Sequence, residues 1–139
     1  MSFPLEGGCD CREVRYRMES ASFALNALIE SERLTLLGAQ PALVDTPSSS
    51  GMGQKIARCP KCHIALWSHY AGAGPVLSFV RVGTLDEPDR LPPDIHIFTA
   101  SKQPWVLIPP AMPAVPEYYD REQYWPRESL ERRRAFKRS

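Results

Sequence analysis

The stretch GGCDC at residues 7–11 places two cysteines, Cys9 and Cys11, one residue apart behind a pair of glycines. In a β-strand, residues i and i+2 point to the same side, so a strand here would direct both sulfur atoms toward one point. Two thiolates are half of a tetrahedral metal site. A metal site at this point therefore needs two further ligands from elsewhere in the chain.

The other two cysteines occur in the segment ARCPKCHIALWS at residues 57–68. A Cys-x-x-Cys turn brings two thiolates within reach of one ion, and its backbone N–H groups can hydrogen-bond to sulfur. Pro60 supports such a turn because its ring restricts φ. A set of four sulfur ligands favours zinc in a closed site with a structural role. The sequence therefore predicts one structural Zn2+ held by Cys9, Cys11, Cys59 and Cys62.

Two other interpretations of the cysteines stay open. A redox pair formed by Cys59 and Cys62 would be expected to open a helix after a strand, whereas the following HIALWSH has the pattern of a strand. Buried cysteines without any ligand are the third interpretation. Metal analysis of the purified protein distinguishes the three.

Composition limits the class of protein. The chain has 139 residues, of which 43% are hydrophobic and 24% charged, as in a soluble globular protein. No apolar run approaches the roughly 18 residues that a membrane span needs, so we expect no membrane partner. A net charge of +1 argues against nucleic acid as a partner. Because no basic segment followed by an apolar stretch opens the chain, we expect a cytoplasmic, reducing location, where disulfides are uncommon.

The pattern of residues predicts a mainly antiparallel β protein with a short C-terminal helix. Fourteen scattered prolines disfavour long helices. After Pro126, the stretch RESLERRRAFKR has good helix formers and no breaker, with six basic and two acidic side chains in residues 127–139. We expect a β domain over residues 1–109, then an extended arm and basic helix over residues 110–139. The expected strands are 14–18, 23–30, 34–37, 42–45, 55–58, 65–70, 77–82 and 95–98.

Three segments together resemble a known family: GGCDCREVRYRM, ARCPKCHIALWSHY and VRVGTLDEPDRLPPDIHIFTASKQPWV. They are similar to the landmarks of the glutathione-dependent formaldehyde-activating (Gfa-like) and centromere protein V family, and the likeness runs from residue 7 to residue 106. The resemblance implies a zinc-binding β domain of Mss4-like fold with carbon–sulfur lyase activity. The family's type reaction joins glutathione and formaldehyde to form S-hydroxymethylglutathione, so a small thiol such as glutathione is the expected partner.

The same resemblance assigns roles to individual residues. The four cysteines match the family's structural zinc ligands. Asn26, Ser101 and Lys102 match positions near the substrate, and Lys102 could meet a substrate carboxylate through a charge-assisted bond. A structural role for Asn26 and a solvated Lys102 are the alternatives.

The chain departs from the family at the catalytic zinc. Relatives carry a further Cys-His-Cys-x-x-Cys motif after the first strand, whereas this chain reads VRYRMESASFALNALIE over residues 14–30. All four cysteines of the chain are already assigned, so the sequence identifies no catalytic residue. Either the natural protein carries a Cys-rich loop after Glu19 that the printed sequence lacks, with a second, catalytic zinc, or the protein has lost this loop.

Two functions follow from these observations. The first is a zinc-binding carbon–sulfur lyase that acts on the aldehyde adduct of glutathione or another small thiol. The second is a catalytically silent, zinc-stabilised binding or scaffold protein.

An aromatic group lies just before the basic helix and consists of Tyr118, Tyr119, Tyr124 and Trp125. It could anchor the arm to the domain or to a second copy of the chain, so a homo-oligomer stays open.

Overall fold

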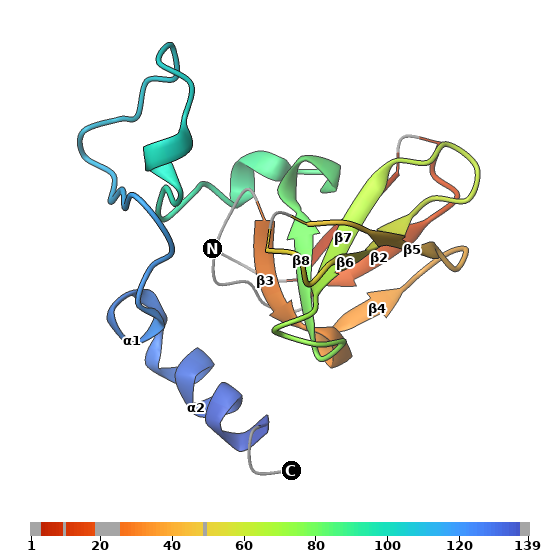
Figure 1. Ribbon diagram of the computed structural model, residues 1–139. Helices are drawn as coiled ribbons and strands as arrows, with labels where there is room; N and C mark the ends of the chain where they lie inside the picture. The colour runs from red at the N-terminus through yellow and green to blue at the C-terminus, as the bar shows by residue number, and fades with distance from the viewer. Residues whose placement is uncertain (1–3, 10, 19–25, 49, 137–139) are drawn as a thin grey trace. The chain divides into compact units, whose positions relative to one another are not determined.

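The computed structural model describes residues 4–9, 11–18, 26–48 and 50–136 (Figure 1). The chain divides into two compact units, Met1–Pro92 and Pro93–Ser139. A division between residues 109 and 110, as expected from the sequence, stays a prediction.

The first unit contains two antiparallel sheets (Figure 1). The smaller sheet has the order β1-β2-β4 and consists of β1 (Leu5–Gly8), β2 (Arg15–Met18) and β4 (Leu34–Leu36). The larger has the order β3-β8-β7-β6-β5 and consists of β3 (Asn26–Glu30), β5 (Ala42–Thr46), β6 (Gln54–Arg58), β7 (Ala65–Tyr70) and β8 (Leu77–Arg81). The predicted mainly β fold is confirmed.

The alternation in β2 explains how the smaller sheet contributes to the core. Tyr16 and Met18 are fully buried, while Arg17 pairs with Glu6 across the sheet at 2.7 Å. Tyr16 contacts Trp67 of the larger sheet edge to face, with ring centroids 5.8 Å apart. Its hydroxyl lies 2.9 Å from Thr84 Oγ1, and burial raises the pKa of Tyr16 to about 12. The buried cluster formed by both sheets also includes Cys9 and Cys59.

Two differences from the sequence prediction concern the first unit. Strand β1 was not predicted, because the glycines of LEGG are poor strand formers. Cys9 and Cys11 do not lie in a strand as expected, but in the turn between β1 and β2. Short 3₁₀ helices fill the connections η1 (Ser31–Arg33), η2 (Val82–Thr84) and η3 (Pro88–Arg90).

In the second unit, the predicted strand at residues 95–98 is wrong. His96 forms one isolated bridge with Ala114, and Phe98 adopts a left-handed conformation with φ of 54°, which ends any extended run. A short 3₁₀ helix, η4 (Thr99–Ser101), follows directly.

The predicted C-terminal helix is confirmed. Helix α2 (Arg127–Phe136) begins after Pro126, whose carbonyl oxygen accepts hydrogen bonds from the N–H groups of Ser129 and Leu130. A shorter helix, α1 (Arg121–Tyr124), precedes it and is capped by Asp120. Within the described ranges, no helix combines the length and apolar character needed to cross a bilayer.

Candidate metal centre

Two turns of similar construction carry the four cysteines. In the turn after β1, the N–H of Arg12 donates to the carbonyl oxygen of Cys9 at 3.0 Å; in the turn after β6, His63 donates to Cys59 at 2.9 Å. The residue after the second cysteine is left-handed in both, because Arg12 and His63 each have φ of 62°. The backbone therefore reverses direction at each pair and presents both sulfur atoms to the same side.

The glycines of GGCDC make room for the first turn. A Cβ on Gly8 would lie 2.3 Å from the carbonyl oxygen of Val14, and one on Gly7 would lie 2.6 Å from the hydroxyl of Tyr16. Contacts this short are not tolerated, so only glycine fits at these positions. The pair of glycines thus allows the hairpin that positions Cys9 and Cys11.

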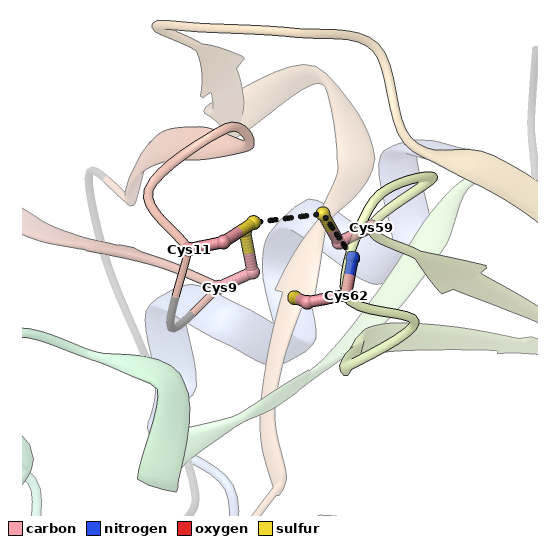
Figure 2. A group of neighbouring side chains, drawn as sticks. All are labelled: Cys9, Cys11, Cys59 and Cys62. Carbon is pink, nitrogen blue, oxygen red and sulfur yellow. Dashed lines mark hydrogen bonds between the residues drawn. The ribbon is translucent and has the colours of Figure 1, made fainter.

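The four sulfur atoms converge (Figure 2). All lie within 4.8 Å of one another, with Sγ–Sγ distances of 3.3 Å between Cys9 and Cys11 and 3.4 Å between Cys11 and Cys59. Tetrahedral zinc with bonds of about 2.3 Å separates its sulfur ligands by about 3.8 Å. The donor set and its spacing fit zinc with only small adjustments. The predicted gathering of the four cysteines is confirmed, and zinc binding by them stays a prediction.

Backbone N–H groups support negative charge on two of the sulfurs. Val14 donates to Cys9 Sγ at 3.4 Å, and Lys61 and Cys62 donate to Cys59 Sγ at 3.4 and 3.5 Å. Burial disfavours ionisation of Cys9 and Cys59, but these backbone hydrogen bonds and the hydrogen bonds from neighbouring thiols together outweigh it, so the pKa of each thiol is lowered.

For Cys11, the effects that raise the pKa of the thiol exceed the one that lowers it. A hydrogen bond from the backbone of Glu13 favours its thiolate, but burial and the three neighbouring sulfur atoms together raise its pKa to about 12. Several thiolates so close together repel one another unless a cation lies among them. The cluster therefore has the electrostatic character of a cation site.

Asp86 forms ion pairs with two arginines, one in the first cysteine turn and one at the start of β2. Asp86 Oδ1 accepts hydrogen bonds from Arg12 Nη1 at 2.7 Å and from Arg15 Nη1 at 2.8 Å, and Asp86 Oδ2 pairs with Arg15 Nη2. The hydrogen bond from Arg15 is the main cause of a lowered pKa of the Asp86 carboxyl group. Sequence reasoning missed this group, because its members lie 74 and 71 positions apart and no local pattern connects them.

The remaining predicted site residues lie elsewhere. Asn26 is on β3 in the first unit, where its Oδ1 accepts from Arg81 Nη1 at 2.9 Å. Ser101 and Lys102 are in the second unit; Ser101 Oγ donates to the carbonyl oxygen of Phe98 at 3.1 Å, and Lys102 is exposed. Their roles toward a substrate stay predictions. The segment after Glu19, where the resemblance leads us to expect the catalytic motif, falls in residues 19–25, outside the described ranges.

A protein-family model matches most of the chain. The family model described as glutathione-dependent formaldehyde-activating enzyme matches residues 4–101, which is 98 of the 139 residues. The matched segment contains both cysteine turns. The search of curated proteins finds no match to the chain.

Proposed function

Because the chain belongs to the glutathione-dependent formaldehyde-activating enzyme family, we propose that it is a zinc-binding carbon–sulfur lyase for an aldehyde adduct of a small thiol. In the direction of synthesis, the thiol sulfur bonds to the aldehyde carbon and the thiol proton moves to the carbonyl oxygen. The reverse reaction breaks the same carbon–sulfur bond. The family match over both cysteine turns carries this proposal, with glutathione as the first thiol to test.

Cys9, Cys11, Cys59 and Cys62 would hold the zinc in this proposal. Four thiolates complete a tetrahedral set and leave no position for substrate, so the metal's contribution is to connect the turn after β1 to the turn after β6. A reducing, cytoplasmic setting is part of the proposal, since the thiols then stay available for metal. Asn26, Ser101 and Lys102 are proposed to contact the substrate.

The number of cysteines favours a second candidate function. The chain has four cysteines, and all belong to one cluster, which leaves no thiols for a catalytic zinc. A zinc-stabilised binding or scaffold protein without lyase activity fits this observation. A second zinc enters only if the natural protein carries a further Cys-rich loop after Glu19.

One pair of measurements tests the two candidates. The exchange between labelled formaldehyde and its glutathione adduct is followed by NMR exchange spectroscopy, with and without the purified protein, and bound zinc is quantified on the same sample. The lyase proposal expects faster exchange than in the protein-free control. One equivalent of zinc with unchanged exchange would contradict the lyase and support the scaffold. Two equivalents would establish ligands beyond the four cysteines.

A further inference from the structure

The guanidinium group of Arg81 is held between two neutral side chains from neighbouring strands. Its Nη1 donates to Asn26 Oδ1 at 2.9 Å and its Nη2 donates to Ser68 Oγ at 3.0 Å. Strands β3 and β7, which carry Asn26 and Ser68, flank β8 on either side. The position of this cation is therefore determined by three adjacent strands of the larger sheet and not by a flexible loop.

Arg81 faces away from the main core. The preceding residue, Val80, is fully buried in the core cluster, and successive strand residues point to opposite faces. Ser68 is fully buried, and the cross-strand pair of Leu28 and Phe79 lies on the same face as Arg81. Arg81 itself is partly buried, and charge at a partly buried position interacts more strongly than it does in water.

Within the described residues, no acidic side chain balances the charge of Arg81. No carboxylate forms an ion pair with it within the described part of the chain, whereas Arg15 and Arg17 pair with Asp86 and Glu6. A partly buried cation is costly unless an anion neutralises it. A guanidinium also has more N–H donors than its bonds to Asn26 and Ser68 use. Toward the described residues, the guanidinium of Arg81 therefore keeps N–H donors that are available to an anionic acceptor.

We propose that Arg81 binds a carboxylate group of the small thiol on which the protein acts, with Asn26 and Ser68 holding the guanidinium in place. This inference rests on the proposed function for its ligand. A guanidinium donates to both oxygens of a carboxylate in one plane, which a neutral thiol cannot reproduce. Arg81 would therefore select anionic thiols, such as small peptides with free carboxylates, over uncharged ones.

Calorimetric titration with two unreactive probes tests this selection. S-methylglutathione has a blocked sulfur and free carboxylates, and its diethyl ester lacks the negative charges. The zinc-loaded, full-length protein is expected to bind the acid at least about 10-fold more tightly than the ester. Arg81→Gln is expected to lower the affinity for the acid by about 10- to 100-fold and to remove its preference over the ester.

A second variant keeps the test independent of the loss of the arginine. Asn26→Asp introduces a carboxylate directly beside Arg81, so it neutralises the cation while the guanidinium stays, and it should weaken acid binding to a similar extent. Arg17→Gln, which changes an arginine already paired with Glu6, is the matched control and should bind the acid as the wild type does. Zinc content and thermal midpoint are recorded for each variant. If Arg81→Gln does not fold, Asn26→Asp decides through the ratio of acid to ester affinity, because the added charge weakens binding of the acid alone, whereas loss of an amide contact weakens both.

The outcomes separate this inference from the proposed function. Equal binding of acid and ester by the wild type, or unchanged acid binding in both variants, would overturn the Arg81 site. Arg81-dependent binding without faster formaldehyde exchange would contradict the lyase but support the carboxylate site. Faster exchange that Arg81→Gln leaves unchanged, in both rate and KM, would support the lyase and overturn the site.

Discussion

The sulfur atoms of Cys11 and Cys59 lie 3.4 Å apart, although the two residues are 48 positions apart in the chain. Cys11 belongs to the hairpin of the smaller sheet, and Cys59 directly follows a strand of the larger one. A metal ion shared by these thiols would connect the two sheets and close the long loop between them. Binding of a structural zinc is worth roughly 10–16 kcal/mol in small zinc-finger peptides, which is comparable to the whole stability of a domain.

Loss of one ligand should therefore destabilise the first unit. Cys59→Ser is expected to lose most of the bound zinc and to lower the free energy of unfolding by about 4 kcal/mol or more. Elemental analysis and denaturant unfolding measure the two effects. Lys61→Ala is the matched control, since Lys61 supplies a backbone N–H to Cys59 Sγ and its side chain is exposed. A Cys59→Ser protein as stable as this control would contradict a structural metal.

The ion pairs of Asp86 predict a pH dependence. The pKa of Asp86 is lowered below its ordinary 3.8, so its stabilisation is present above 3.8 and is lost as the pH falls through the lower value. Because these pairs are partly exposed, Asp86→Asn is expected to lower the free energy of unfolding by only about 1 kcal/mol at neutral pH.

Denaturant unfolding over a range of acidic pH checks the Asp86 prediction. The difference between wild type and Asp86→Asn should shrink as the pH falls below 3.8. Asp45→Asn breaks the pair with Lys55, in which Asp45 is 84% exposed, and should have almost no effect. A difference that is constant with pH would show that Asp86 does not act through its charge.

The left-handed conformation of His63 makes it a site for stabilisation. Residues with a Cβ are strained there, whereas glycine is not. His63→Gly should raise the free energy of unfolding by about 0.5 to 1 kcal/mol after the entropy of the unfolded chain is counted, while the β-branched His63→Val should lower it. Thermal unfolding of the zinc-loaded proteins compares the two. The reverse order of stability would mean that the turn does not have this conformation.

Gly8 should tolerate no side chain. In Gly8→Ala the new Cβ would meet the carbonyl oxygen of Val14 in the same hairpin, and the backbone must move to relieve the contact. A loss of about 1–3 kcal/mol in the free energy of unfolding is expected. Gly83→Ala is the control, because a Cβ there has nothing within 4 Å, and its effect should stay within about 0.5 kcal/mol. Similar effects of both changes would contradict the close approach at Gly8.

Local patterns were sufficient for much of the fold. The strand over residues 65–70 and the helix after Pro126 were predicted because alternation and helix propensity act over a few neighbouring residues. The predicted strand at residues 95–98 failed, although its residues are good strand formers, because β propensity does not supply a partner strand. Strand β1 was missed for the converse reason: its glycines are poor strand formers, and its pairing with β2 overrides that preference.

The sequence by itself determined the family, the β class and the identity of the four thiols, because ligand type and ligand spacing are local chemical facts. Only the tertiary structure decided that Cys11 lies beside Cys59, that Asp86 joins Arg12 to Arg15, and that Arg81 lies between Asn26 and Ser68 with no acidic partner in the described ranges. These contacts join residues far apart in the chain, and the pairing of strands into sheets brings them together. No spacing within a single segment encodes that pairing.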